Sequence, residues 1–568
     1  MPKRILIIAI AFFALACTNC HHEEEQEDFS SLPSLHITMS SLQLDSILAQ
    51  RDNKVSAYAV LTDVKGDTLF QGNLTHIKTR GNGSFDEKKK PFAIKFPKKQ
   101  AFFGLDRGKS FVLLANACDE SYIRNAIALD LALAFGIPAP RYAYLTLYIN
   151  DTYWGLYQIT NKVHVGKDAL DIADLEERNE WYNQKPLEEY EWYGRGRKGP
   201  LVQRMGFLLD NDPDDITGGY LIENSGPRSP YQRSFSGFVS NAEDHIRIRS
   251  PKYASPNEVD YIANLYNEME SAIMAPDGIC PESGRHYSEY IDVESFARYY
   301  LLNELLLNWD GGWASFFMYK DTDVNDPKIY AGPAWDFDRT LDNDHFLDGM
   351  LVFSNEMFVC EQKGNVGIAS SGGLLYYLCQ HEDFQQVVCD CYMNEISSVC
   401  HRYLEEHPFD SLASSLSHEA DRDNAKYNSR HSVDYASASQ RAVGFLSERI
   451  AFFDKYYSSM DEGHVLVYYE WRYQKNLTFC YLLGEPVNAP QLTTVVYNHD
   501  PVYTMYYPGT DSIVPDGTIF YTPQKLELRK REPTNQEVLM RRIRKKLAKI
   551  GLDFLTLPPL HPRILSKH

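Results

Sequence analysis

The sequence lacks several features that would assign it to a class of protein at once. No two cysteines form a CxxC pair, which argues against a structural zinc site. After residue 20 there is no run of 18 consecutive apolar residues, so no internal transmembrane helix is expected. The 57 Lys and Arg are outnumbered by 77 Asp and Glu, giving a net charge of −20. This balance argues against nonspecific binding to nucleic acid.

The composition is that of a folded protein with more than one domain. Of the 568 residues, 44% are hydrophobic and 24% are charged. The chain has ten cysteines, and Cys17 belongs to the N-terminal signal considered next. The nine others are an odd number, so at least one is expected to be free or paired between chains. Cys379, Cys389, Cys391 and Cys400 lie close together in sequence. They fit core thiols as well as part of a disulfide set, and the sequence does not decide between these.

The first 20 residues are typical of a bacterial export signal. Lys3 and Arg4 precede an apolar stretch, residues 5–15, which is too short to span a bilayer. The segment Ala14-Leu15-Ala16-Cys17 resembles a lipoprotein box, which predicts that Cys17 is lipidated and holds the protein on a membrane. An ordinary secretory signal with a nearby cysteine is the alternative.

Residues 21–34 are predicted to be a polar tether. Their acidic run, residues 21–28, resembles the export tag that follows lipidated cysteines in the Bacteroidetes. The similarity predicts a lipoprotein of the outer membrane or cell surface. In the alternative interpretation, the run is only a solvated linker.

Beyond the tether, the periodicity predicts an α+β protein in three parts. Residues 35–163 contain about five strand patterns and one helix, which begins near Ser121 and has one apolar stripe. Residues 164–460 are predicted to be mainly helical. Residues 461–568 are predicted to form a β-rich appendage that ends in a basic helix at 535–550. The basic face of that helix fits a solvated surface as well as a contact for a membrane or partner.

Two acidic segments 26 residues apart are the main chemical signal. Asn308-Trp309-Asp310 ends a helical pattern, and Trp335-Asp336-Phe337-Asp338 follows an apolar stretch broken by Gly and Pro. Phosphoryl transfer uses one carboxylate to orient the attacking hydroxyl and others to hold Mg²⁺ on the phosphates. Each Asp also fits an ordinary turn or loop carboxylate.

A basic segment accompanies the acids. The glycine-rich turn Arg80-Gly81-Asn82-Gly83-Ser84 follows a strand pattern, and six lysines occur between residues 88 and 99. Lys95 differs from the others because Ile94 and Phe96 flank it inside a strand pattern. A lysine on a rigid strand can reach nucleotide phosphates, although it also fits a solvated strand lysine.

A series of short motifs covers roughly residues 35–350. The stretches are Arg80–Asn82, Lys90–Phe96, Val112–Asn116, Ile123–Asn125, Leu145–Asn150 with Tyr153–Tyr157, Gly218–Glu223, Asn308–Asp310, Phe316–Asp321 and Trp335–Asp338. In this order they resemble the motifs of the CotH-type kinases, named for spore coat protein H. Arg124 and Asn125 among them also fit helix capping and packing.

The resemblance implies a two-lobed, atypical protein-kinase-like fold that phosphorylates Ser of a protein acceptor, using ATP and Mg²⁺ or Mn²⁺. Residues 35–163 would be the β-rich N-lobe and residues 164–460 the C-lobe. Asp310 would be the catalytic base, and Asp336 and Asp338 the metal ligands. Lys95, with Arg80 and Asn82, would bind the nucleotide.

Three departures from the kinase pattern leave open the alternative that the chain is an inactive kinase. Position 315, five residues after Asp310, is Ser where kinases have Asn. The helix after Lys95 offers only Asp130 as a partner for that lysine. Asn161 stands before Lys162, where the family tends to have an acidic residue.

Two other functions compete with the kinase. Residues 336–341 also fit the DxDxT signature of haloacid-dehalogenase-type phosphatases, although that motif needs a buried strand directly before it. The second alternative is a surface lipoprotein that uses an inactive kinase-like fold as an adhesin or glycan- or protein-binding module. Metal-dependent nucleotide binding would separate it from the kinase.

Overall fold

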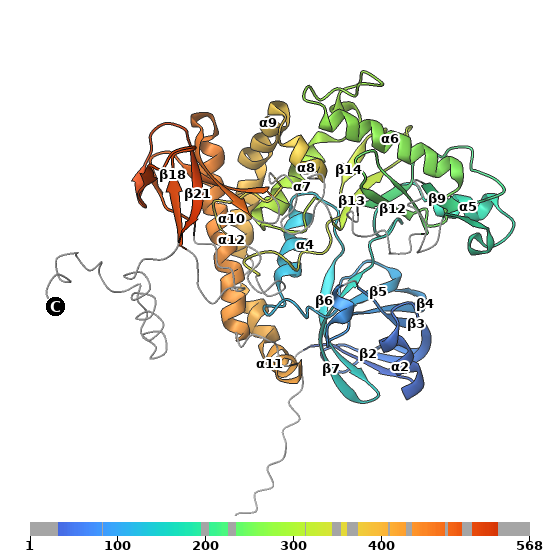
Figure 1. The fold of residues 1–568 in the computed structure, drawn as a ribbon. Helices are drawn as coiled ribbons and strands as arrows, with labels where there is room; N and C mark the ends of the chain where they lie inside the picture. The colour runs from blue at the N-terminus through green and yellow to red at the C-terminus, as the bar shows by residue number, and fades with distance from the viewer. Residues whose placement is uncertain are drawn as a thin grey trace, which may run out of the picture.

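The fold is described from a computed structural model (Figure 1). The described residues are 32–81, 83–194, 204–224, 235–312, 314–343, 354–360, 373–406, 409–427, 434–471, 475–490 and 502–531. The export signal with Cys17, most of the tether, Asn82 and the basic segment at 535–550 therefore lie outside them.

The N-terminal part is a closed seven-stranded barrel, blue to cyan in Figure 1. Its strand order is β1-β2-β3-β4-β5-β7-β6, and parallel pairing of β1 with β6 closes it. The strands are β1 (Ser34–Thr38), β2 (Val55–Thr62), β3 (Thr68–Thr79), β4 (Phe92–Gln100), β5 (Gly108–Leu114), β6 (Tyr142–Ile149) and β7 (Thr152–Asn161).

Side chains fill the barrel, so its functional groups must lie outside. On β4, Phe92, Ile94 and Phe96 are buried in the interior, and the Phe96 ring packs edge-on against Phe111 at 5.6 Å. Because strand side chains alternate, Lys95 lies on the outer face. The barrel is a packed scaffold that presents polar residues on its surface.

Five of the seven barrel strands contain the predicted segments, and β1 and β3 were missed. β1 is short, and it is stabilised by pairing with β6, which lies more than 100 residues later. β3 is mostly polar and contains Gly72 at φ 153°, so it lacks a clear apolar alternation. The predicted helix is α4 (Arg124–Ala134), and two short helices, α2 (Ser41–Ala49) and α3 (Gly83–Asp86), accompany it.

A second, antiparallel sheet follows in the order β14-β13-β10-β12-β11-β9-β8. It lies under the helix α6 (Pro256–Met274) in Figure 1. Its strands are β8 (Trp192–Tyr193), β9 (Arg204–Phe207), β10 (Tyr220–Asn224), β11 (Ser236–Val239), β12 (His245–Ser250), β13 (Phe316–Lys320) and β14 (Ile329–Ala331). The sequence analysis did not predict this sheet, because its strands are short and separated by long polar connections.

Helices supply most of the remaining regular structure of the predicted helical part. α7 is buried along most of its length and leads directly to Asp310. α12 runs between α4 and the C-terminal strands (Figure 1). The helices are α5 (Leu175–Tyr182), α7 (Val293–Leu305), α8 (Gly373–Leu378), α9 (Glu382–Cys391), a π-helical turn (Tyr392–Ile396), α10 (Ser397–Glu406), α11 (Phe409–Tyr427) and α12 (Tyr435–Ser458).

The C-terminal part is β-rich, as the strand patterns predict. A sheet of order β16-β15-β21-β18-β19 stands beside a pair formed by β17 and β20. The Cys480 amide donates to the Glu356 carbonyl at 2.7 Å, which joins this sheet to the segment 354–360. The strands are β15 (His464–Trp471), β16 (Lys475–Leu482), β17 (Pro486–Val487), β18 (Val502–Tyr506), β19 (Ile513–Val514), β20 (Thr518–Ile519) and β21 (Gln524–Arg531).

The structure also bears on the cysteines and on membrane insertion. No disulfide joins any two of the eight cysteines within the described ranges, seven of which are buried. The core-thiol interpretation therefore holds for the set between Cys379 and Cys400. None of the described helices has the length and hydropathy needed to cross a membrane.

Candidate functional site

Asp310 lies in the turn that follows α7. The Asn308 side chain shapes this turn, because its amide nitrogen donates to Asn303 Oδ1 at 2.9 Å and its oxygen accepts from the Asp310 amide at 3.2 Å. Arg339 donates to Asp310 Oδ1 at 2.9 Å. The first acidic motif is thus joined to the segment that carries the second.

The second acidic motif lies on a loop after β14. Asp336 is exposed and has a φ of 72°, a left-handed conformation that is uncommon for a residue other than glycine. Ser315 Oγ donates to Asp336 Oδ2 at 3.0 Å. Such strain persists only where the surrounding structure holds the backbone in place, and it occurs often at functional sites.

Helix α4 holds this acidic loop. Arg124 Nε donates to the carbonyls of Thr340 and Leu341, at 3.0 and 3.2 Å. Asn125 Oδ1 accepts from the Phe337 amide at 2.9 Å. The motif residues Arg124 and Asn125 therefore position the loop that carries Asp336 and Asp338, beyond any role in starting the helix.

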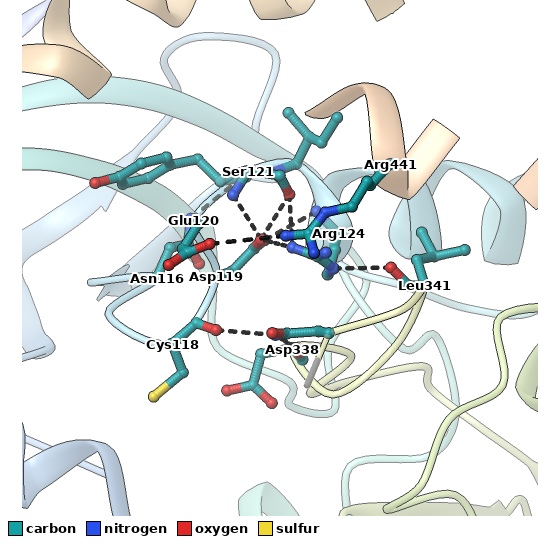
Figure 2. Close-up of polar contacts among 12 residues, drawn as sticks. Asn116, Cys118, Asp119, Glu120, Ser121, Arg124, Asp338, Leu341 and Arg441 are labelled. Atoms are coloured by element: carbon teal, nitrogen blue, oxygen red, sulfur yellow. Dashed lines mark hydrogen bonds and ion pairs between the residues drawn. The ribbon is translucent and has the colours of Figure 1, made fainter. Parts of the chain in front are cut away.

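Arg124 is itself fixed by a buried ion pair, shown in Figure 2. The Asp119 carboxylate accepts from Arg124 Nη1 at 2.5 Å and from the Arg124 amide at 3.0 Å. Ser121 donates to the same carboxylate through its amide and its hydroxyl. Both members of the pair are almost fully buried, so the geometry of the acidic loop depends on a rigid polar network.

The three aspartates lie close enough to influence one another. Burial raises the pKa of Asp310, Arg339 opposes this, and Asp336 raises it further. Burial, together with Asp336 and Asp310, raises the pKa of Asp338 to about 8. Carboxylates that repel one another in this way are a natural place for a cation.

The donor set fits a divalent cation that is shared with phosphates. Within the described part of the chain, no group of three or more His, Cys, Asp or Glu side chains is arranged to hold a metal ion alone. Mg²⁺ normally takes one or two carboxylates together with substrate phosphates and water. Asp336 and Asp338 supply that number of carboxylates.

We expect Asp338→Asn to stabilise the metal-free protein. A carboxyl with an ordinary pKa of 3.8 in the unfolded chain and about 8 in the folded one makes the free energy of unfolding fall as the pH rises between these values. The substitution should remove that loss and gain on the order of 1 kcal/mol at pH 8, discounted for partial exposure. Denaturant unfolding should show a smaller gain at pH 5; equal gains would contradict the raised pKa.

Of the two basic residues predicted to bind the nucleotide, Arg80 lies near the acids and Lys95 lies beside His76. The guanidinium of Arg80 lies 5.6 Å from the centre of the Trp335 ring, and Asp336 counteracts the lowering of the Arg80 pKa by burial. Lys95 lies on the outer face of β4, between His76 on β3 and Ser110 on β5. The structure therefore brings Arg80 to Asp336, whereas the charge of Lys95 acts on His76.

The sequence matches the family model described as "CotH kinase protein" over residues 77–453, which is more than half of the chain. The chain belongs to the CotH kinase family. The matched part begins in β3, includes α11 and most of α12, and ends before the C-terminal sheet.

Comparisons beyond the family model add little. No curated protein matches this sequence. A crystal structure of a Helicobacter pylori proinflammatory kinase, CtkA, is similar, with 12% identity over 62% of this chain and 94% of that chain. Its TM-score of 0.20 is too low for that structure to inform the geometry of the site.

The sequence analysis of this CotH family member noted Lys162 only for the residue that precedes it, and counted neither Lys162 nor Arg249 among the site residues. Lys162 directly follows β7 and keeps contact with solvent. Partial desolvation by the surrounding protein, together with the charges of Arg249 and Lys252, lowers its pKa to about 8. Arg249 forms an ion pair with the buried Glu223 on the neighbouring strand β10. The local signals for Lys162 were its place at the end of a strand and the family pattern at Asn161-Lys162. The cations around it come from β12 and the loop after it.

Two of the departures from the kinase pattern acquire a structural meaning. Ser315 is the residue that bonds to Asp336, so the position keeps a contact with the acidic loop. Asp130 accepts from the hydroxyls of Tyr142 and Tyr403, at 2.8 and 3.2 Å, and so has structural partners other than Lys95. The dehalogenase alternative is disfavoured, because β14 ends at Ala331 and Asp336 lies in a loop.

Proposed function

We propose that this chain is an ATP- and metal-dependent phosphotransferase that phosphorylates Ser or Thr of a protein acceptor. The observation that carries the proposal is the convergence of Asp310, Asp336 and Asp338 from two loops, opposite Arg80 of the barrel. Membership of the CotH kinase family supports the same reaction class. The barrel and the sheet-and-helix part would act as the two lobes of the kinase.

In this mechanism Asp310 orients the acceptor hydroxyl and accepts its proton. Its ion pair with Arg339 favours the ionised form that a base needs. Asp336 and Asp338 would hold the divalent ion. When bound, that ion neutralises charge on the transferred phosphoryl group. Positioning and charge neutralisation supply most of the rate in such chemistry.

The nucleotide phosphates would bind to the basic side of the site. Arg80 is close to Asp336, and Lys162 is exposed in a positive environment made by Arg249 and Lys252. An exposed lysine among other cations is electrostatically suited to a polyanion. We assign Lys95 to the same role on the resemblance alone, and Asn82, outside the described residues, likewise.

The protein would act outside the cytoplasm. The export signal and the lipoprotein box at Cys17 support attachment to the outer membrane or the cell surface. ATP is scarce there, which favours the alternative of an inactive kinase-like binding module. Nucleotide binding separates the two functions.

Label transfer from γ-labelled ATP tests the proposal. The mature chain is incubated with Mg²⁺ or Mn²⁺, alone and with acidic and Ser-rich protein acceptors, and nucleotide binding is followed by calorimetry. Metal-dependent label on the acceptor or on the chain itself supports the phosphotransferase. Absence of both transfer and metal-dependent binding would refute it in favour of the binding module.

The two candidate phosphate lysines can be separated. We expect Lys162→Met to raise the KM for ATP about tenfold or more, which corresponds to one lost charge-assisted contact. Lys95→Met should have a smaller effect, because Lys162 and Arg80 share the neighbour Arg249, whereas the charge of Lys95 acts on His76. The KM for ATP and circular dichroism would be measured for both variants. The reverse order of effects would return the phosphate role to Lys95.

A further inference from the structure

A carboxylate from α11 is buried against the barrel. Asp423 Oδ2 lies 2.7 Å from Lys89 Nζ and accepts from the Tyr122 hydroxyl at 2.6 Å. Its Oδ1 accepts from the Leu156 amide at 3.0 Å. The Lys89 and Asp423 side chains are only 3% and 2% exposed. The sequence analysis singled out neither residue for a function.

The ammonium group of Lys89 is enclosed on several sides. It donates to the Leu156 carbonyl at 2.5 Å and lies 5.1, 4.8 and 5.9 Å from the ring centres of Tyr122, Tyr157 and Tyr427. Cation–π contacts of this kind stabilise a cation that has lost its water. The contacts of Lys89 and those of Asp423 therefore hold this ion pair in one geometry.

Gly155 makes room for the carboxylate. Its φ is 131°, and a Cβ at this position would overlap Asp423 Oδ1. Gly155 belongs to the Tyr153–Tyr157 motif, so the small residue in that motif is required by a residue about 270 positions later. This gives a way to displace the carboxylate without removing any charge.

Asp423 bonds to the segments that carry the two sides of the candidate site. Lys89 lies two residues before Pro91, whose carbonyl accepts from the Arg80 amide at 3.0 Å. Tyr122 lies just before α4, whose Arg124 holds the acidic loop. One side chain of α11 thus joins the basic side to the acidic side.

The rest of α11 strengthens this contact. Arg422 stacks its guanidinium 3.8 Å from the centre of the Tyr153 ring, and Tyr427 donates to the Trp154 carbonyl at 2.5 Å. Lys426 donates to the Tyr153 carbonyl. Figure 1 shows α11 beside β7 at the edge of the barrel. The last turns of α11 therefore pack against the hairpin of β6 and β7.

We propose that Asp423 is a positioning residue that sets the distance between Arg80 on the barrel and the acidic loop at Asp336. This distance determines how a nucleotide fits between the two sides of the site. The inference rests on the proposed function. A buried ion pair contributes little net stability, because both charges lose their water, so its main contribution here is to orientation. The partners of Asp423 are Lys89, Tyr122 and the Leu156 amide, and none of them belongs to the acidic motifs.

The test uses three variants. Two are the single substitutions Asp423→Asn and Gly155→Ala. The third, called the neutral pair, is a double variant that combines Lys89→Met and Asp423→Asn. Gly66→Ala is the control, since Gly66 has a φ of 85° but no atom within 4 Å of an added Cβ. Spin labels at Val64 in the barrel and Val324 beside the second sheet, 58% and 89% exposed, report the distance between the two parts. Protein without the introduced cysteines corrects for labelling elsewhere.

Positioning predicts a broader distance distribution and a kcat/KM for ATP about tenfold lower or more in Asp423→Asn and Gly155→Ala, with Gly66→Ala unchanged. The neutral pair should recover the melting temperature without recovering kcat/KM. Recovery of both, or an unchanged distance distribution in Gly155→Ala, would show a purely structural pair. If the unsubstituted protein neither binds ATP nor transfers label, the proposed function fails, while the distance measurement still decides whether Asp423 sets the geometry.

Discussion

Asp310→Asn should reduce phosphoryl transfer by roughly 100- to 10,000-fold, the usual contribution of a positioned base, while metal-nucleotide binding stays nearly intact. The amide keeps the shape of the side chain and can still accept from Arg339, but it cannot take the proton of the acceptor hydroxyl. Asp336→Asn should instead weaken metal-nucleotide binding itself, by about tenfold or more, because a ligand charge is lost.

These effects would be measured by label transfer for the chemical step and by calorimetry for binding. Asp45→Asn is a suitable control, since Asp45 is exposed on α2, in the barrel part away from the acidic loops. Circular dichroism would verify that each variant folds. Equal activity in the unsubstituted protein, Asp310→Asn and Asp336→Asn would overturn the site assignment.

Arg124→Met should lower the free energy of unfolding by about 3–5 kcal/mol, the usual cost of removing one partner of a buried ion pair. The substitution leaves the buried Asp119 without its cation and removes the bonds to the carbonyls of Thr340 and Leu341. Since these bonds hold the acidic loop, metal-nucleotide affinity should fall in the fraction that remains folded. Denaturant unfolding and calorimetry measure the two effects.

Arg441→Met is the matched control for this prediction. Arg441 also pairs with an acid, Glu120, but at 3.8 Å and with 42% of its side chain exposed. The Glu120 side chain is 9% exposed, but Arg441 is open to solvent and the pair is long, so a smaller change than for Arg124→Met is expected. If Arg124→Met were no more damaging than Arg441→Met, the buried network would not be what holds the acidic loop.

Local patterns were sufficient to predict the acidic motifs and the helices that lead to them. The apolar stripe of α7 predicted a helix ending just before Asp310, and the structure has this helix at Val293–Leu305. The stripe beginning at Ile123 predicted α4 in the same way. Periodicity of this kind reflects burial of one face of a single element, so it can be detected without knowing the partner.

Contacts between distant segments could not be predicted in this way. Lys162 acquires its environment from Arg249 and Lys252, which lie more than 80 residues later. Closure of the barrel through β1, and the sheet made of short strands, likewise depend on pairing between segments far apart in the chain. No window of sequence contains both members of such a pair.

The sequence by itself was enough to predict an export signal and the α+β class, to recognise the family resemblance, and to identify the acidic residues to test. The tertiary structure alone decided that Arg124 and Asn125 hold the acidic loop, that Arg80 approaches Asp336, and that Asp423 of α11 is buried against the barrel. The reason is that the chemical type of a side chain and the local periodicity can be recognised from the residues next to it in the sequence. Its partner, its desolvation and therefore its pKa come from residues that only folding brings near.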